Sequence, residues 1–508
     1  MTGILNLLAG SISSAIKDGY FNLTTLLLSG NGTNGAQNNT FLDSSSNNFT
    51  ITRNGNTTQG TFTPFSQTGW GNYFAAAADF ISIPDSSNVQ LGSGDFTLEF
   101  WTYLTSSFTT QWITGKGDAA TGAGTALSFY GTLVQFYSGS TNYDITIPSG
   151  TWVTNTWSHV ALVRTGTSSG NLRLYVNGQL INSASIGSNT INTGGSNPLK
   201  IGSYAGTGPI CYISNYRLVK GTALYTSAFT PPTSPLTAIS GTTLLTCQSN
   251  RFLDASSNNA IITASGTPSV QAFSPFAPTA AYDSSVVGGS GYFDGTGDYL
   301  TAPANAAYAM GTGDFTIECW VNTSLTSARY IFDIRPSASQ CIGAYISSNT
   351  LYINSGSTLD ISASTAFVLG AWNHFAYVRS GSGTNNVSIF LNGSRVYQRT
   401  DTTNYSTNPI LYIGADNGGS YSNGGYISGF RVLKGTAQYS GATYTVPTAP
   451  PTAITNTQLL LNFTNAGITD ATAKNDLETV GNAQISTTQS KFGGSSMYFD
   501  GKIGRAHV

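Results

Sequence analysis

TyrIleSerAsnTyrArgLeuValLysGlyThrAlaLeuTyr at 212–225 returns as TyrIleSerGlyPheArgValLeuLysGlyThrAlaGlnTyr at 426–439, and 9 of the 14 positions are identical. A repeat of about 215 residues is longer than any solenoid unit and has the size of a whole domain. It therefore indicates tandem copies of one folded unit. The sequence predicts two complete units followed by the beginning of a third.

Proline-rich segments separate the predicted units, because clustered prolines keep a chain extended and semi-rigid. We expect a leader at 1–18 that forms a short helix, domain 1 at 19–228, a spacer at 229–240, domain 2 at 241–443, a spacer at 444–455 and a truncated start of domain 3 at 456–501. Each unit is expected to open with a short apolar strand and an Asp-led turn, which reads PheLeuAspSerSerSerAsnAsn at 41–48 and PheLeuAspAlaSerSerAsnAsn at 252–259.

The last residues depart from the repeat. After Gly501 the third copy should continue like the second, but it reads LysIleGlyArgAlaHisVal. Residues 503–508 back-translate to the sequence of a common short-read sequencing adaptor. We therefore expect 502–508 to be an artefact of sequencing and the natural chain to continue into a full third domain.

Charge is scarce and evenly spread along the chain. Only 8% of residues are charged, the net charge is -2, and no run of Lys or Arg exists that could neutralise a row of phosphates. We therefore expect no nucleic-acid partner. No apolar stretch approaches the roughly 20 residues that span a bilayer. The four cysteines do not occupy matching positions in the two units, so they are expected to be free, buried thiols.

Short runs rich in β-branched and aromatic residues, separated by turn clusters, predict an all-β sandwich or barrel. Asn177-Gly178 and Asn392-Gly393 predict hairpins with type I′ turns. Alternation along 95–101 and 314–320 separates an inward set of side chains from an outward one. The inward set is Phe96, Leu98, Phe100, Phe315, Ile317 and Cys319, and the outward set is Thr97, Glu99, Trp101, Thr316, Glu318 and Trp320.

Several blocks taken together resemble the laminin-G-like, concanavalin A-like jelly roll. They are GlyAspPheThrIleGluCysTrp at 313–320, TrpAsnHisPheAlaTyrValArg at 372–379, IlePheLeuAsnGly at 389–393 and TyrIleGlyAla at 412–415, with counterparts at 94–101 and 157–164. The resemblance implies tandem antiparallel β-sandwich jelly rolls with a binding function. The repeated LysGlyThrAla, the proline spacer and the Asp-led turn further resemble repeat proteins of tailed bacteriophages, especially marine ones, which implies a virion or tail-fibre protein.

Concanavalin A-like folds also include glycoside hydrolases, which need two carboxylates on either side of the scissile bond. Glu99 and Glu318 are solitary on their strands, so we expect them to make structural hydrogen bonds on a wet sheet face. His159 and His374 occupy matching positions, and a buried histidine bonded to backbone explains this repetition. No catalytic residue is predicted.

Two kinds of binding site are candidates. The loop at 413–420 resembles the acidic rim loop of the pentraxin branch, which nominates Asp416 and Asn417 as ligands for calcium in domain 2; the matching loop of domain 1 has no carboxylate. Asp79 and Asp298 are instead expected to cap local turns. Exposed aromatic residues flanked by amides and hydroxyls favour carbohydrate binding. The candidates are Tyr137, Asn142, Tyr143, Tyr421 and Asn423.

These observations predict a non-enzymatic structural and adhesion protein on a virion, where repeated weak contacts raise avidity. Its expected partners are host-surface glycans or proteins and other virion proteins, and no membrane span is expected. No cofactor is required, and calcium is a candidate ligand in domain 2 alone. Two alternatives stay open: a bacterial surface or secreted adhesin, and the carbohydrate-binding portion of a truncated carbohydrate-active enzyme. Either would be extracellular.

Overall fold

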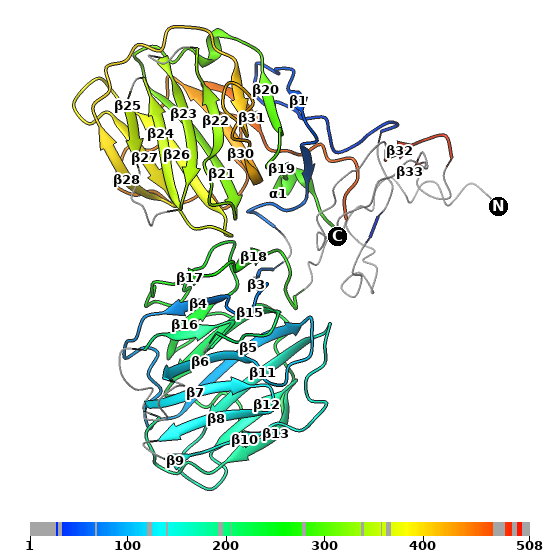
Figure 1. Ribbon diagram of the computed structural model, residues 1–508, viewed down its shortest axis with the longest axis vertical. Helices are drawn as coiled ribbons and strands as arrows, with labels where there is room; N and C mark the ends of the chain where they lie inside the picture. Colours follow the sequence, from blue (N-terminus) through cyan, green and yellow to red (C-terminus); the bar gives the residue numbers. More distant parts are fainter. Residues whose placement is uncertain are drawn as a thin grey trace, which may run out of the picture.

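The computed structural model describes residues 27–28, 33–66, 69–118, 124–138, 141–191, 197–204, 206–276, 281–336, 340–356, 358–361, 367–470, 483–489 and 495–499. Most of these residues form two β-sandwiches, each made of two antiparallel sheets (Figure 1). The all-β prediction is thereby confirmed. The predicted helix at 1–18 and the tail at 502–508 lie outside the described residues.

Domain 1 is the sandwich that surrounds β5 and β6. Its β5 sheet has the order β13 (Gln179–Ala184), β12 (Leu172–Val176), β11 (Trp157–Arg164), β5 (Phe96–Leu104), β15 (Cys211–Lys220), β3 (Gly71–Phe74) and β18 (Ser269–Gln271), and β16 (Thr242–Thr246) also pairs with β15. Its β6 sheet has the order β10 (Ile145–Thr146), β8 (Leu133–Ser138), β7 (Gly124–Tyr130), β6 (Trp112–Asp118), β14 (Leu199–Ile201), β4 (Phe80–Ile83) and β17 (Thr263–Ser265), and β9 (Thr141–Asn142) pairs with β8.

Domain 2 repeats this arrangement around β21 and β22. Its β21 sheet has the order β2 (Thr58–Gly60), β19 (Ser290–Asp294), β30 (Gly424–Lys434), β21 (Phe315–Thr323), β26 (Asn373–Arg379), β27 (Val387–Leu391) and β28 (Ser394–Arg399), and β31 (Thr457–Leu461) also pairs with β30. Its β22 sheet has the order β1 (Thr52–Asn54), β20 (Tyr299–Ala302), β29 (Leu411–Ile413), β22 (Arg329–Ile334), β23 (Ile342–Ser347), β24 (Thr350–Ser355) and β25 (Thr358–Ile361). Smaller elements are α1 (Ser284–Val287), the 3-10 turn η2 (Ala306–Tyr308) and the pair β32 (Gln484–Ser486) and β33 (Ser496–Tyr498).

The core of each sandwich lies between its two sheets, where alternation along the strands places the apolar side chains. The predicted inward residues are all 2% exposed or less: Phe96, Leu98 and Phe100 in domain 1, and Phe315, Ile317 and Cys319 in domain 2. All four cysteines are free and buried, as predicted. Both Asn-Gly hairpins have the expected left-handed backbone, with φ of 50° and 77° at Asn177-Gly178 and of 51° and 88° at Asn392-Gly393.

The strand pairing crosses the domain boundary predicted at the spacer 229–240. β16, β17 and β18 follow the proline-rich spacer, but they pair with β15, β4 and β3 of domain 1. Residues 242–271 therefore complete domain 1 and do not open domain 2 as expected. The repeat aligned the copies correctly, but sequence similarity does not say which of two equivalent sheet edges a strand joins.

Domain 2 is completed by strands from both ends of the described chain. β31 pairs with β30, whereas β1 pairs with β20 and β2 pairs with β19. In Figure 1 the blue strand β1 lies beside β20 at the edge of the upper sandwich, and the green strands β17 and β18 lie in the lower one. Residues 52–60, which were predicted to belong to domain 1, are thus edge strands of domain 2.

The Asp-led turns join these edge strands to the rest of each domain. In domain 1, Asp254 Oδ1 accepts hydrogen bonds from the backbone N–H groups of Leu245 (3.0 Å) and Ser256 (2.9 Å). In domain 2, Asp43 Oδ1 accepts the same bonds from Leu460 (3.0 Å) and Ser45 (2.8 Å). Each turn is therefore fixed by a buried carboxylate to a strand on the neighbouring sheet edge.

Asp79 and Asp298 cap local turns, as predicted, and also hold the edge strands. Asp79 Oδ2 accepts from the N–H groups of Ala75 and Ala76 (3.0 Å each), while its Oδ1 accepts from Thr267 N (2.8 Å). Asp298 repeats this arrangement, because it accepts from Asp294 N at 3.0 Å and from Asn56 N at 2.7 Å.

The proline-rich segments do not act as free spacers. Leu236 is buried, and its N–H donates to Asn215 Oδ1 at 2.8 Å. Arg217 Nη1 donates to Thr237 O at 2.8 Å, and Arg431 Nη1 donates to Thr452 O at 3.0 Å in domain 2. Both segments are therefore packed along the outer face of the sheet they follow, and their backbone carbonyls satisfy buried arginines.

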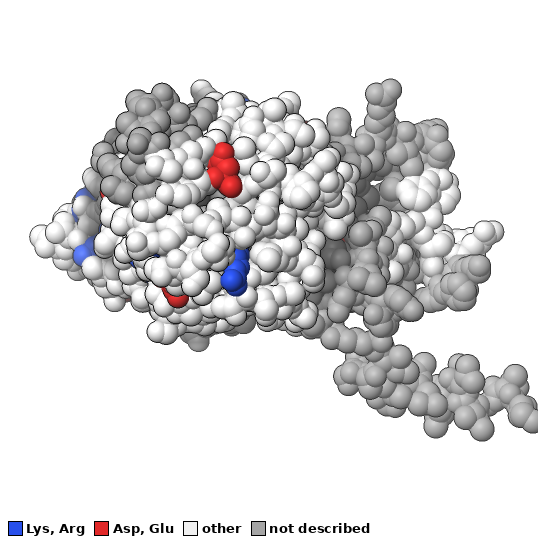
Figure 2. Space-filling model, turned by 90° about the horizontal axis from the view of Figure 1, so that it is seen from below, with Lys and Arg blue, Asp and Glu red and all other residues white. Residues whose placement is uncertain are grey.

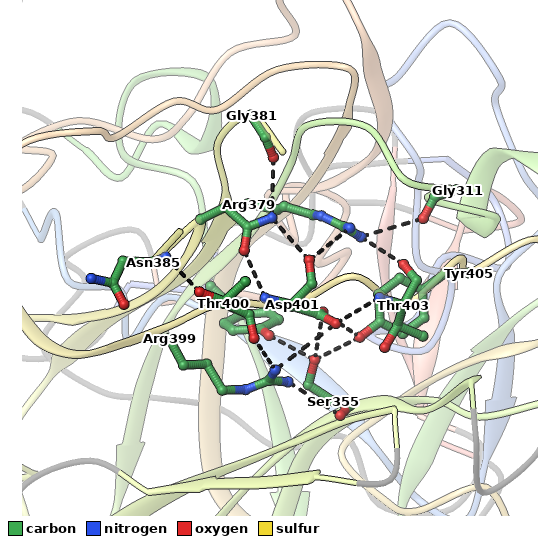
Figure 3. Close-up of polar contacts among 12 residues, drawn as sticks. Gly311, Ser355, Arg379, Gly381, Asn385, Arg399, Thr400, Asp401, Thr403 and Tyr405 are labelled. Carbon is green, nitrogen blue, oxygen red and sulfur yellow. Dashed lines mark hydrogen bonds and ion pairs between the residues drawn. The ribbon is translucent and has the colours of Figure 1, made fainter. Parts of the chain in front are cut away.

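A buried polar cluster holds the far end of domain 2 together (Figure 3). Asp401 is 2% exposed; its carboxylate accepts from Tyr405 OH at 2.8 Å and Ser355 Oγ at 3.2 Å. Arg379 Nη2 donates to the backbone carbonyl of Asp401 at 2.9 Å. Burial acts to raise the pKa of Asp401, but bonds from Thr403 and Tyr405 outweigh it and lower the pKa. The cluster connects the end of β24 to the segment after β28.

The surface carries few charges. Figure 2 shows one end of the molecule, where isolated Lys, Arg, Asp and Glu side chains lie among uncharged residues. Among the described residues, no helix has the length and apolar character needed to cross a lipid bilayer.

The role of Asp43 in attaching its turn to β31 of domain 2 is testable. Asp43→Ala leaves the buried Leu460 and Phe49 N–H groups without acceptors, and unpaired buried donors cost about 1 to 3 kcal/mol each. We expect faster hydrogen exchange in β30 and β31 of domain 2, with β15 and β16 unchanged. Asp254→Ala is the matched control and should reverse the pattern. Loss of protection in domain 1 on Asp43→Ala would contradict the observed pairing.

Candidate functional site

The outer face of the β22 sheet carries one tyrosine on each of five neighbouring strands. They are Tyr299 on β20, Tyr412 on β29, Tyr330 on β22, Tyr345 on β23 and Tyr352 on β24, and we call them the tyrosine face. All five are partly exposed, because alternation turns them away from the buried apolar residues of the same strands. With strands about 4.8 Å apart, five strands span roughly 19 Å.

The rings of the tyrosine face form two groups. Tyr330, Tyr345 and Tyr352 lie in register across their strands, with ring centroids 5.2 Å apart in the first pair and 4.8 Å apart in the second. Tyr299 and Tyr412 form the other group, with centroids 5.8 Å apart. Tyr330, Tyr345 and Tyr352 are stacked on one another, so the five rings form a partly exposed aromatic surface that carries phenolic hydroxyls.

An ion pair between a buried carboxylate and a partly exposed arginine lies between the two groups. Asp333 stands in register between Tyr412 and Gly343, and its carboxylate lies 2.9 Å from Arg335 Nη2. Burial raises the pKa of Asp333 to about 6, although the charge of Arg335 acts in the opposite direction. Arg335 Nη2 also donates to the hydroxyl of Tyr330 at 3.0 Å. The centre of the face is therefore polar and its charges are paired.

Two predicted ligand-binding residues of domain 2 lie at this site. Tyr421 is 58% exposed, and its ring centroid is 6.4 Å from that of Tyr330, so it extends the tyrosine face. Asn423 is fully buried, and within the described part of the chain its side-chain amide has no hydrogen-bond partner. Tyr421 is thus placed for ligand contact, and Asn423 is not.

The predicted calcium ligands border the tyrosine face. Asp416 Oδ1 accepts from Gly418 N at 3.0 Å and from Ser420 N at 2.7 Å, and Asn417 N donates to Asp333 Oδ2 at 3.2 Å. The described residues contain no group of three or more His, Cys, Asp and Glu side chains that could hold a metal. Calcium binding by Asp416 and Asn417 stays a prediction.

The candidates in domain 1 lie apart from the equivalent sheet centre. Tyr137 pairs with Asn142 at the β8–β9 turn, and the side chain of Tyr137 is outside the described residues. Asn142 is exposed and donates to Asp144 at 2.9 Å, while the hydroxyl of Tyr143 accepts from Asn189 at 2.5 Å. The side chains of Asn142 and Tyr143 are held by these hydrogen bonds near one edge of the sheet.

Domain 1 has different chemistry at the position of the tyrosine face. Trp112 and Tyr130 replace Tyr330 and Tyr345, with centroids 4.6 Å apart. Gly115 stands where domain 2 has Asp333, and a Cβ atom there would lie 2.7 Å from the ring of Tyr204. Tyr204 therefore fills the space over Gly115, and domain 1 has no acidic group at this place.

The residues of the tyrosine face were not singled out from the sequence, although the Ser348-Asn349 pair was an available turn signal. In the structure these two residues have φ of 48° and 65° and form the turn of a two-residue hairpin. This turn places Tyr345 opposite Tyr352. The alignment of β20 and β29 with these strands depends on tertiary pairing and has no local signal.

Glu99 and Glu318 lie in buried networks on the outer faces of the β5 and β21 sheets. Arg217 Nη2 lies 2.6 Å from Glu99 Oε1, Tyr225 OH donates to Glu99 Oε2 at 2.9 Å, and His159 Nε2 lies 3.2 Å from the same oxygen. The predicted structural role is confirmed by these bonds. The predicted wet face is wrong, because Glu99 is fully buried beneath the segment that follows β15.

The network in domain 2 has the same members. Arg431 Nε donates to Glu318 Oε1 at 2.7 Å, Tyr439 OH donates to Glu318 Oε2 at 2.7 Å, and His374 Nε2 lies 3.4 Å away. The prediction that the histidine side chain bonds to backbone is wrong, since its partners are Glu318 and the hydroxyl of Tyr444. Burial acts to raise the pKa of Glu318, but His374 and then Arg431 outweigh it and lower the pKa to about 2.

A family model described as "Concanavalin A-like lectin/glucanases superfamily" matches residues 74–212 and 294–438, which make up more than half of the chain. The chain therefore belongs to this superfamily, and it contains two laminin-G-like sandwich domains. The predicted fold family is confirmed.

Solved structures with a similar fold are of low sequence identity. Domains LG4-5 of the mouse laminin α1 chain share 13% identity at a TM-score of 0.26, over 75% of this chain and 94% of that chain. A putative carbohydrate-binding protein from Bacteroides ovatus shares 18% at a TM-score of 0.29, over 40% and 59%. A SAP-like pentraxin from Limulus polyphemus shares 10% at 0.29, over 40% and 95%. No curated protein matches the chain.

The buried carboxylate of Glu318 should make domain 2 sensitive to acid. Its pKa is about 2 in the folded protein and about 4.5 when unfolded, so it contributes stability above pH 4.5 that is lost as the pH falls toward 2. The contribution is on the order of 3 kcal/mol. We expect Glu318→Gln to be less stable at pH 7 and to have a flatter pH profile of denaturant unfolding below pH 4.5.

Tyr421→Ala is the control, since it removes an exposed side chain that lies against Tyr330 of the β22 sheet, whereas Glu318 lies in the β21 sheet. It should leave the acid-dependent slope of the unfolding free energy unchanged. Parallel pH profiles for Glu318→Gln and the unmodified protein would contradict this role of Glu318.

Proposed function

We propose that this protein is a non-enzymatic adhesion protein that binds glycans through the tyrosine face of domain 2. One observation carries the proposal: five tyrosines on five neighbouring strands form a partly exposed aromatic surface with a polar centre. A sugar ring has an apolar face of C–H groups and a rim of hydroxyls. Tyrosine rings can pack against the C–H face of the sugar, and phenolic hydroxyls and buried acceptors can form hydrogen bonds with its hydroxyl groups.

The chemistry of the face favours a neutral glycan. Asp333 is paired with Arg335, so neither offers an uncompensated charge to a ligand. Asn354 Nδ2 donates to the hydroxyl of Tyr330 at 3.1 Å and adds an amide to the surface. Hydroxyl and amide groups recognise sugar hydroxyls without needing an ionic ligand.

The absence of catalysis is part of the proposal. Glu99 on β5 and Glu318 on β21 are each bonded to an arginine, a tyrosine and a histidine, and both are buried. A glycosidase needs two carboxylates that face one bond of the substrate. Glu99 and Glu318 face protein groups, which supports a binding role.

We further infer that the protein is displayed on a virion, where tandem domains present weak sites to host-surface glycans and increase avidity. The support is the resemblance of its repeats to those of tailed bacteriophages. The alternatives are a bacterial surface or secreted adhesin and the binding part of a carbohydrate-active enzyme. Mass spectrometry of purified particles against cell-envelope fractions separates the first two, since only a virion protein copurifies with particles.

Glycan binding is tested with the full chain on an array of neutral and acidic glycans, in calcium and in EDTA. We expect a neutral glycan to bind and Tyr345→Ala to weaken it by about 1 to 2 kcal/mol, roughly tenfold, because its ring stacks between two others. Tyr130→Ala changes the matching position of domain 1 and should have no effect. Equal loss in both variants, or no binding to any glycan, would overturn the proposal.

A further inference from the structure

The segments that complete the two domains are copies of one unit. Residues 41–65 and 252–276, which we call the closing segments, are identical at 13 of 25 positions. Each supplies an Asp-led turn, one edge strand to each sheet of a sandwich, and a pair of phenylalanines at its end. The closing segment 252–276 completes domain 1, and the closing segment 41–65 completes domain 2.

The contacts of the two closing segments match in detail. Phe62 packs on Trp372 (5.3 Å between centroids) and on Tyr426 (4.8 Å), and Phe65 packs on Trp320 (5.9 Å). Domain 1 repeats these contacts with Phe273 on Trp157 (5.2 Å), Phe273 on Tyr212 (4.9 Å) and Phe276 on Trp101 (5.9 Å). Every aromatic contact of this set is made with the domain that the segment closes.

A third copy of the Asp-led turn lies at 468–475, where Asp470 occupies the position of Asp43 and Asp254. Its hydrogen bond shows that the terminal parts have been exchanged. In the central copy, strand and turn are continuous, so Leu245 N bonds to Asp254 of the same segment. In the terminal copies the partners are crossed. Leu27 N donates to Asp470 Oδ1 at 2.8 Å, and Leu460 N donates to Asp43 Oδ1 at 3.0 Å across 417 residues. The same hydrogen bond is thus made within one copy and between two others.

We propose that the closing segment 41–65 is exchanged between copies of this chain, so that it closes domain 2 of a second copy and makes the protein self-associate. The contacts in the exchanged form are those already seen within one chain. The two forms therefore differ in free energy only through the hinge and the chain concentration. Reciprocal exchange makes a dimer, and one-way exchange makes a head-to-tail chain.

The hinge favours exchange. Only residues 66–70 separate the closing segment 41–65 from β3 of domain 1, whereas residues 277–289 separate the other closing segment from β19 of domain 2. In the structure the segment closes domain 2 of its own chain despite this short hinge, and short hinges promote exchange of identical elements between copies. The closing segment 252–276 follows its own partner strand β16 directly, so it closes domain 1 within the chain.

Cysteine trapping distinguishes the two forms. Thr52 lies opposite Thr301 across the β1–β20 pair, and the four native cysteines are buried. Thr52→Cys and Thr301→Cys are prepared as two separate full-length variants, unfolded together, refolded together and oxidised. A disulfide between the two variants can form only between copies. We expect a cross-linked dimer whose fraction rises with chain concentration.

The matched control uses Thr263→Cys and Ser82→Cys, because Thr263 lies opposite Ser82 at the same position of domain 1. This mixture should give no dimer. Absence of dimer in the first mixture, or equal dimer in both mixtures, would overturn the proposal, since equal yields indicate random collision.

Light scattering of the unmodified chain provides a second measurement that needs no cysteine. We expect the average mass to increase with concentration, and an insertion of Gly-Ser residues after Ser66 to reduce the increase because a longer hinge favours closure within the chain over exchange. A monomer at all concentrations, or self-association unaffected by both the insertion and Asp43→Ala, would show that 41–65 is not the exchanged part. Glycan binding by the tyrosine face is independent of either outcome.

Discussion

Each sandwich in this protein depends on a buried carboxylate, Asp254 in domain 1 and Asp43 in domain 2. The carboxylate attaches an edge segment to a strand that lies outside that segment. Asp254 and Asp43 each accept backbone N–H groups from two directions, one within their own turn and one from the strand alongside. A sheet edge left open exposes a row of unpaired backbone groups. The carboxylate therefore decides where the edge strands lie and, with them, where one domain ends and the next begins.

This constraint explains why a tandem array has contiguous repeats in sequence but interlocked domains in space. The segment that follows domain 1 returns to complete it, and then continues into domain 2. The proline-rich stretches belong to the same closure, since Thr237 O and Thr452 O receive the guanidinium groups of Arg217 and Arg431. Those arginines hold Glu99 and Glu318, so the repeated LysGlyThrAla region covers a charge network and is itself structural.

The two domains share this framework and differ in what they present. The networks around Glu99 and Glu318 have the same four types of side chain, whereas the sheet centres differ: domain 2 has Asp333 beside tyrosines, and domain 1 has Gly115 beneath Tyr204. Framework positions are repeated because both cores impose the same geometry. The positions that differ are free of that geometry, and there the two domains differ in the side chains they expose.

The sequence alone determined the fold class, the inward faces of β5 and β21, the Asn-Gly hairpins and the free cysteines, because these follow from local periodicity, turn chemistry and spacing. It also nominated Tyr421, but not the five neighbouring strands that make Tyr421 part of a surface. Only the tertiary structure decided which closing segment completes which domain. It also decided that the side chain of Glu99 is buried away from solvent. Equivalent sheet edges accept equivalent strands, and burial depends on what lies above a side chain. Neither property is local to the residues concerned.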